Sequence, residues 1–192
     1  MAVPLAGSAR EPIETVVRAV IDAAPFSPER NRGRAPVRWV RLDGLHLTLR
    51  FLGPTLEPAV AGVRAAVRAA AAGAAPFTVR IAGGGAFPTP ERPRTIWLGV
   101  VEGANDLAAL ARRVDEAVVP LGWPPEERPF RGHLTLARCE PGPAAVAAVG
   151  RLEEAARGLD VSWTADEVVL FESHTGSGPA RYEALERAPL RG

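Results

Sequence analysis

The tetrapeptide His-Leu-Thr-Leu occurs twice in this chain of 192 residues and constrains its fold more than any other feature. The copies begin at His46 and His133, and the chain contains only three histidines. From the composition, this coincidence has a chance probability on the order of 10⁻⁷ to 10⁻⁶, so it calls for a cause. The repeat therefore predicts two equivalent elements with the same chemistry.

The repeat has the alternation of a β-strand, in which successive side chains point to opposite faces. His46 and Thr48 then share one face of the first copy, and His133 and Thr135 share one face of the second. The leucines lie on the other faces, where they can anchor both strands in a core. Two such strands facing each other would present two imidazoles and two hydroxyls to one small space. This set suits an anionic, tetrahedral group that needs one proton removed and another supplied.

The residues around each copy predict the same order of elements in both halves of the chain. Each half runs through an amphipathic helix, a loop, the repeated strand, a Pro/Gly break, an Ala-rich helix and a further strand. We therefore expect an α+β fold: one bilobal domain over 1–192, with pseudo-repeats at about 1–88 and 89–192. Two largely antiparallel sheets would face each other across a central cleft, with helices outside.

Individual elements follow from the same patterns. The predicted helices cover about 12–24, 57–72 and 105–121 and, after the break at 141–143, the chain up to about 157. The predicted strands cover 37–41, 46–52, 77–81, 95–101, 133–138, 159–164, 167–173 and 181–187. A Pro- and Arg-rich loop is predicted at 25–36.

Composition limits the possible chemistry. The net charge is +1, so no global basic field attracts long nucleic acid. All 23 basic residues are arginine, which excludes Schiff-base and P-loop lysine chemistry and the usual form of ATP-dependent RNA ligation. Any phosphate must be held by Arg, His, Thr or backbone amides. Cys139 is the only cysteine, so neither an internal disulfide nor a thiolate metal cluster is possible.

The sequence also predicts the cellular location of the protein. No apolar run approaches the length of a membrane span, and no signal peptide opens the chain. We expect a cytoplasmic protein without a membrane partner.

Blocks of sequence around both copies resemble the two-histidine (2H) phosphoesterase superfamily, and more closely its RNA 2′,3′-cyclic phosphodiesterase family, once named 2′-5′ RNA ligases. The blocks occur in the family's order and cover almost the whole chain. They are Arg-Trp-Val at 38–40 leading to 46–53, Phe-Pro at 87–88 with 92–94 and 97–100, Arg-Pro-Phe at 128–130 leading to 133–138, and 169–173 with 181–182.

The resemblance implies hydrolysis of an RNA terminal 2′,3′-cyclic phosphate to a 2′-phosphomonoester, without a metal or other cofactor, as a step in RNA processing. It leaves reversible 2′-5′ RNA ligation open. It implies that His46 is the general acid to the departing 3′ oxygen and that His133 is the general base on the attacking water. Thr48 and Thr135 would hydrogen-bond the non-bridging oxygens. The expected partners are RNA ends or oligonucleotides with the cyclic phosphate, bound by a monomer.

Two arginines and one phenylalanine lie near the copies in sequence. Arg138 matches a phosphate-contacting arginine of the family, but regular alternation places it on the leucine face, so it needs a strand end or a bulge to reach the cleft. Phe130 has two interpretations, stacking on a substrate base and packing within its loop. Arg50 is interpreted as a solvated surface side chain.

Other functions remain open. One alternative is a phosphodiesterase for 2′-5′ linked oligonucleotides or small cyclic nucleotides, and another is a non-catalytic RNA-end binder. A His-ligated metal hydrolase is disfavoured because there are three histidines in all and no acidic residue lies at ligand spacing beside either copy.

Overall fold

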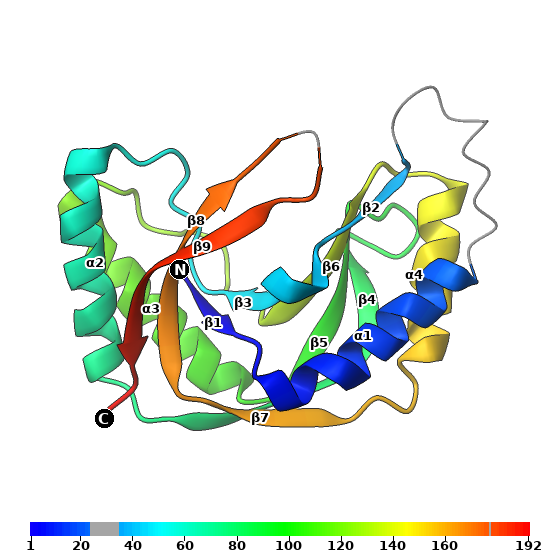
Figure 1. Ribbon diagram of the computed structural model, residues 1–192, viewed down its shortest axis with the longest axis horizontal. Helices are drawn as coiled ribbons and strands as arrows, with labels where there is room; N and C mark the ends of the chain where they lie inside the picture. Colours follow the sequence, from blue (N-terminus) through cyan, green and yellow to red (C-terminus); the bar gives the residue numbers. More distant parts are fainter. Residues whose placement is uncertain (24–34, 177) are drawn as a thin grey trace.

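The computed structural model describes residues 1–23, 35–176 and 178–192, and four α-helices lie in this part of the chain (Figure 1). Each helix has a stripe of buried apolar residues along one side, as its sequence pattern requires. The four predicted helices are therefore confirmed, within a few residues at their ends. They are α1 (Gly7–Asp22), α2 (Glu57–Ala72), α3 (Ala104–Val118) and α4 (Pro143–Ala155).

Helix α1 begins earlier than predicted, and Pro12 lies inside the helix rather than in its first turn. Proline removes one backbone donor there. Ala9, in the additional turn, is fully buried, as is Ile13. Burial of this extra turn therefore offsets the missing hydrogen bond. Most of the predicted loop at 25–36 lies outside the described residues.

All strand pairings are antiparallel, and nine strands of the described chain form one curled sheet with the order β7-β4-β5-β6-β3-β1-β8-β9, while β2 pairs with β6 off this path. The strands are β1 (Ala2–Pro4), β2 (Val37–Trp39), β3 (His46–Thr48), β4 (Phe77–Phe87), β5 (Thr95–Glu102), β6 (His133–Cys139), β7 (Val161–Ala165), β8 (Glu167–His174) and β9 (Arg181–Pro189).

The predicted antiparallel α+β architecture is confirmed, with one correction. The two predicted sheets are continuous, because β3 pairs with β6. The two His-Leu-Thr-Leu copies thus lie side by side in one sheet instead of facing each other from separate sheets. The reason is that their leucines enter one common core, which pairing along the strand edges permits.

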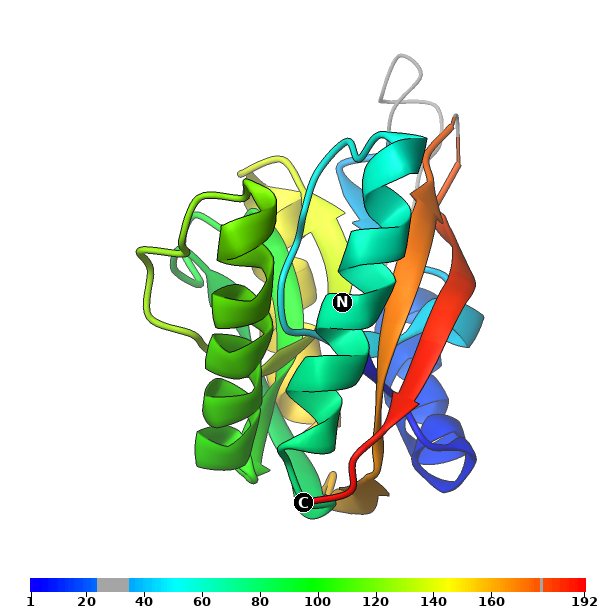
Figure 2. The same ribbon diagram turned by 90° about the vertical axis from the view of Figure 1, so that its left-hand side faces the viewer.

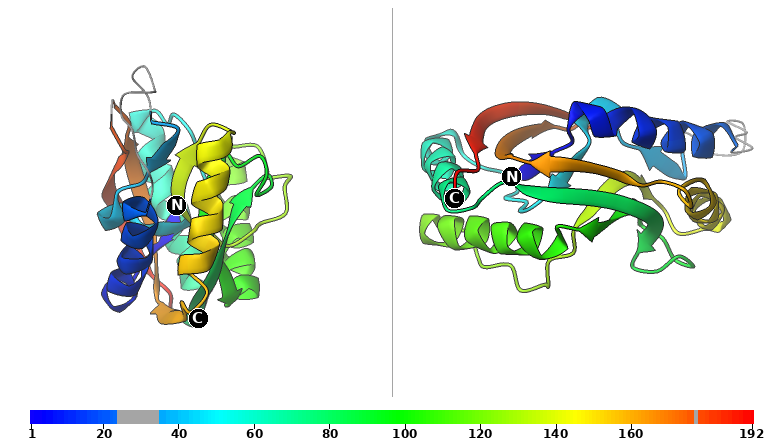
Figure 3. Two further views of the ribbon diagram at one scale, coloured as in Figure 1. Left: turned by 90° about the vertical axis from the view of Figure 1, so that its right-hand side faces the viewer. Right: turned by 90° about the horizontal axis from the view of Figure 1, so that it is seen from below.

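The helices pack in two pairs at opposite ends of the curled sheet. Figure 2 shows α2 beside α3, and the left view of Figure 3 shows α1 beside α4. Leu47, Leu134 and Leu136 are fully buried on the inner face of β3 and β6. The opposite face of these two strands is therefore left for polar side chains. None of the described helices is long and apolar enough to cross a membrane.

Candidate active site

The two copies of the repeat bring their polar side chains onto one face of the sheet. Leu47 of β3 pairs with Leu134 of β6 in antiparallel register. One residue further in each direction, this register places His46 opposite Thr135 and Thr48 opposite His133. We call these four residues the His–Thr quartet.

The histidines occupy diagonal corners of the quartet. In an antiparallel pair, directly opposite residues have Cβ atoms about 5 Å apart, and diagonal ones about 7–8 Å apart. The two imidazoles therefore share one face of the strand pair, with a hydroxyl at each remaining corner. His46, His133 and Thr135 are half-buried and Thr48 is exposed, so the face is open to a ligand.

Both imidazoles are oriented by the same local hydrogen bond. Nδ1 of His46 lies 2.8 Å from the carbonyl oxygen of Gly44, and Nδ1 of His133 lies 2.7 Å from that of Arg131. A carbonyl oxygen can only accept, so Nδ1 is the protonated nitrogen in each neutral ring. Nε2 is then the atom of each ring that can take up or give a proton at the site.

Burial lowers the pKa of both His46 and His133 below the ordinary value for histidine. The hydrogen bonds to the backbone carbonyls act in the opposite direction, and the positive charge of Arg138 lowers the pKa of His133 further. In the free protein both rings therefore favour the neutral form at neutral pH. A bound anion would favour protonation of the ring nearest to it.

Aromatic side chains hold each imidazole from the side. The His46 ring centroid lies 5.4 Å from that of Phe171 and 4.7 Å from that of Tyr182, the latter edge-on. The His133 ring meets Phe87 edge-on at 5.0 Å. These contacts fix the rings against rotation. The sequence interpretation gave these aromatic residues no site role, although all three lie in the blocks that carry the family resemblance.

Gly44 allows the contact between Tyr182 and His46. A Cβ on Gly44 would lie 2.9 Å from Cδ2 of Tyr182, closer than packed side chains tolerate. The Tyr182 ring thus packs directly on the backbone whose carbonyl orients His46.

A β-bulge in β6 changes the face on which Arg138 lies. Thr135 pairs with Trp97 of β5, but Ala137 pairs with the next residue along, Ile96, so two steps on β6 match one on β5. Such an extra residue reverses the alternation beyond it. Arg138 therefore shares the face of Thr135 and of the quartet.

The bulge is consistent with burial and hydrogen bonding around it. Leu136 and Ala137 are both fully buried, although they are neighbours in a strand. Nη1 of Arg138 donates to Oγ1 of Thr95 at 2.6 Å, and Thr95 is itself buried. The bulge that the sequence interpretation required for Arg138 is thus present, and it places Arg138, an exposed residue, beside the quartet.

Arg50 is buried, which corrects its interpretation as a solvated side chain. It is 9% exposed and forms ion pairs with Asp115 and Glu126, each at 3.1 Å, and it donates to the carbonyl of Pro124. These partners belong to α3 and to the segment that leads to His133. Arg50 therefore ties the end of the first copy to the approach of the second.

Phe130 is half-buried and packs against the hydrophobic core. This contact agrees with the packing interpretation, and its stacking on a base stays a prediction. His174 lies at the end of β8 and is exposed.

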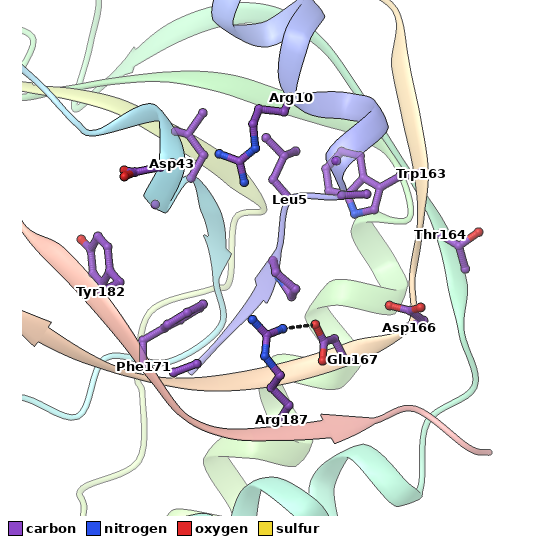
Figure 4. A pocket seen from close by; sticks show the side chains of 16 residues that line it. Leu5, Arg10, Asp43, Trp163, Thr164, Asp166, Glu167, Phe171, Tyr182 and Arg187 are labelled. Atoms are coloured by element: carbon purple, nitrogen blue, oxygen red, sulfur yellow. Dashed lines mark hydrogen bonds and ion pairs between the residues drawn. The ribbon is translucent and has the colours of Figure 1, made fainter.

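A hollow of about 510 Å³ adjoins the aromatic neighbours of His46 (Figure 4). Phe171 and Tyr182 border it, and the guanidinium groups of Arg10 and Arg187 point into it from opposite sides. Neither quartet histidine lines it. It is therefore a neighbour of the site rather than the place where the two imidazoles converge.

Within the described ranges, one group of His and acidic side chains is close enough to share a metal ion. It consists of Glu172, His174 and Glu183 on the β8–β9 hairpin, all exposed. His174 already lies 3.4 Å from Glu183 in an ion-pair geometry. This group contains neither His46 nor His133.

Comparison with known proteins identifies the family of this chain. A sequence profile described as the 2′-5′ RNA ligase superfamily matches residues 11–177. A Geobacillus stearothermophilus protein named RNA 2′,3′-cyclic phosphodiesterase is 35% identical over all of this chain and 57% of its own length. A Thermus thermophilus protein of the same name is 32% identical over 92% of this chain and 85% of its own length.

An Aeropyrum pernix protein of the same name is 38% identical over 54% of this chain and 57% of its own length. The chain thus spans little more than half the length of several curated relatives. Solved structures match along the whole chain. One from Thermus thermophilus has a TM-score of 0.73 at 29% identity, and Escherichia coli LigT complexed with 3′-AMP has 0.68 at 26% identity; this chain covers 96% of each. The chain belongs to the 2′-5′ RNA ligase superfamily, which confirms its resemblance to the two-histidine phosphoesterases.

Proposed function

We propose that this protein hydrolyses the 2′,3′-cyclic phosphate at an RNA end to a 2′-phosphomonoester. The quartet carries this proposal, because two imidazoles lie diagonally across one strand pair with Nδ1 of each engaged by a backbone carbonyl. Relatives named RNA 2′,3′-cyclic phosphodiesterase support the same substrate.

His133 acts as general base and His46 as general acid. Nε2 of neutral His133 takes a proton from water as the water oxygen attacks phosphorus. The bond between phosphorus and the 3′ oxygen breaks, and protonated His46 gives its Nε2 proton to that oxygen. One water is thereby added, and a 2′-phosphate and a 3′-hydroxyl result. Each positioned proton transfer typically contributes roughly 10² to 10⁴ in rate.

The remaining groups bind the phosphate and the base. Thr48 and Thr135 donate hydrogen bonds to the non-bridging oxygens, and Arg138 offsets their charge. The bulge and the contact with Thr95 support this role for Arg138. Phe130 stacks on the terminal base with the accessible part of its ring.

The reaction as written uses only side chains and water, so we propose that it needs no metal ion or other cofactor. We further propose that the protein acts as a monomer in the cytoplasm on RNA ends or oligonucleotides that carry the cyclic phosphate.

The chain is proposed to be one domain of two pseudo-repeats, about 1–88 and 89–192. Apart from β2, which has no counterpart in the second repeat, the order β1-α1-β3-α2-β4 parallels the order β5-α3-β6-α4-β7. The equivalent strands β3 and β6 pair with each other, and each helix pair takes one helix from each repeat. Both observations support the internal duplication.

The family's name supports a second activity, reversible 2′-5′ RNA ligation. In that reaction the 5′-hydroxyl of another RNA replaces water as the attacking group, and the same bond to the 3′ oxygen breaks. The proposed roles of His46 and His133 are unchanged.

The test is incubation with an RNA that ends in a 2′,3′-cyclic phosphate, in the presence of excess EDTA, with the product identified by phosphorus NMR. We expect a 2′-phosphate. A 3′-phosphate would reverse the acid and base assignment, and binding without turnover would indicate an RNA-end binder. Loss of activity in EDTA, with recovery on adding one divalent metal, would refute the metal-free chemistry.

A further inference from the structure

Two arginines face each other across β2 and β6, beside the quartet. Arg38 pairs directly with Arg138 in antiparallel register. Cross-strand partners project from the same face, so Arg38 shares the face on which the bulge places Arg138. Like charges directly opposite each other destabilise a strand pair. Their position next to the proposed phosphate site therefore needs an explanation.

This arginine pair has little compensating charge in the part of the chain that the structure describes. Nη1 of Arg38 is buried there without a hydrogen-bond partner. Its ion pair with Glu140 is long, at 3.9 Å, and the Glu140 side chain is 64% exposed. Water screens such a contact. Arg138 is held by the neutral hydroxyl of Thr95. The Arg38 side chain as a whole is 36% exposed, so an anion bound from solvent would compensate the two charges together.

The spacing along the sheet indicates which anion. Thr135 and Arg138 pair with Trp97 and Thr95, which are two residues apart on β5. Two residues of a strand span about 7 Å. The arginine pair therefore lies one such step beyond the quartet, and successive phosphates of an RNA strand have a comparable separation. Planar guanidinium groups match phosphate oxygens in pairs of hydrogen bonds.

We propose that Arg38 and Arg138 form a second anion subsite that binds the internucleotide phosphate on the 5′ side of the terminal nucleotide. Arg138 borders both phosphates, whereas Arg38 contacts the second alone. The inference rests on the proposed function and deepens it: the quartet takes the cyclic phosphate, and the arginine pair selects an RNA end over a free cyclic mononucleotide.

The experiment compares kcat/KM for two substrates, a dinucleotide ending in a 2′,3′-cyclic phosphate and 2′,3′-cyclic AMP. Their ratio measures the preference for an oligonucleotide. Arg38→Gln should lower this ratio at least about ten-fold, the size expected for a charged hydrogen bond. Arg38→Lys keeps the charge but loses the paired hydrogen bonds, so it should lower the ratio less than Arg38→Gln does. The matched control is Arg112→Gln, which removes one exposed arginine of α3 that pairs with Glu116; it should leave the ratio unchanged.

The salt dependence of kcat/KM provides a second measurement, which a folding defect would not change. For the dinucleotide, Arg38→Gln should reduce the slope of log kcat/KM against log salt by about 0.7, the value for one phosphate contact on a single strand. Equal losses on both substrates, or no loss on either, would overturn the subsite while leaving the proposed function intact. Wild-type protein that hydrolyses neither substrate would refute the proposed function, and the subsite with it.

The substrate provides an independent test if Arg38→Gln does not fold. Adding a 5′-phosphate to 2′,3′-cyclic AMP should raise kcat/KM of the wild-type protein at low salt, because that phosphate occupies the second subsite. A 5′-phosphate that leaves kcat/KM unchanged or lowers it would contradict the subsite.

Discussion

Leu47 and Leu134 form the cross-strand pair that joins the two halves of the sheet, and the four quartet residues stand on either side of this pair. Both leucines are buried almost completely. Their packing therefore sets the separation between the two histidines. Stability of the sheet and geometry of the site depend on the same contact.

Replacing Leu134 by alanine should lower the free energy of unfolding by about 2–5 kcal/mol, as for other buried leucines. Urea unfolding measures this loss. Leu56→Ala is the matched control, because Leu56 is 80% exposed and its loss should change stability by no more than about 0.5 kcal/mol. A Leu134 variant as stable as the Leu56 variant would show that this pair does not hold the halves together.

Replacing Arg50 by alanine should destabilise the protein by about 2–4 kcal/mol, because the substitution leaves Asp115 and Glu126 without their positive partner beside a buried site. The expected loss begins below the range of about 3–5 kcal/mol for fully buried pairs, because Glu126 is 37% exposed. Arg112→Ala breaks only a surface pair and should change stability by no more than about 0.5 kcal/mol. Chemical denaturation compares the two variants, and equal effects would argue against Arg50 as the tie between the copies.

Replacing Gly44 by alanine should lower kcat/KM about ten-fold, because the added Cβ displaces Tyr182 and shifts the carbonyl that orients His46. Overpacking should also lower stability by about 1–3 kcal/mol. Gly7→Ala is the control, since a Cβ there meets open space. Steady-state kinetics distinguish them; an unaffected Gly44 variant would mean that Tyr182 does not position the imidazole.

Stability should fall as the pH drops below about 6.5 in the absence of ligand. The pKa values of His46 and His133 are lowered in the folded protein, whereas the unfolded chain has the ordinary value near 6.5. At pH values between the lowered pKa and the ordinary pKa, the unfolded chain binds more protons than the folded protein. Lowering the pH through this range therefore favours unfolding. Urea midpoints from pH 7 to pH 5 measure the fall, and His133→Asn should reduce it. NMR titration with both pKa values at or above 6.5 would contradict this.

Sequence patterns predicted the helices and the pairing of His with Thr because both follow from short-range periodicity. The stripe of α3 and the alternation around Leu134 are local properties. They did not predict that β3 and β6 are neighbours in one sheet, because strand pairing depends on contacts between residues 46–48 and 133–139 that no local pattern encodes.

The residues that support the quartet also depend on contacts between distant parts of the chain. Arg50 looks like any surface arginine in sequence, and its burial arises only when α3 and the segment after it cover it. The contacts of Phe171 and Tyr182 with His46 join strands far apart in the chain. For Arg138, the sequence could state the need for a bulge but not show where it lies.

In the proposed reaction His46 donates a proton and His133 accepts one, and the pH dependence of kcat/KM in single variants tests these roles most directly. The wild-type profile on a cyclic-phosphate RNA end should be bell-shaped, with its limbs reporting the coupled pair. His46→Ala should abolish most of the activity and remove the alkaline fall from the remainder. His133→Ala should remove the acidic fall instead. Both variants should give the circular dichroism spectrum of the wild type. Near-wild-type activity in either folded variant would contradict the paired-histidine mechanism, and loss of the same limb in both would contradict the assignment of acid and base.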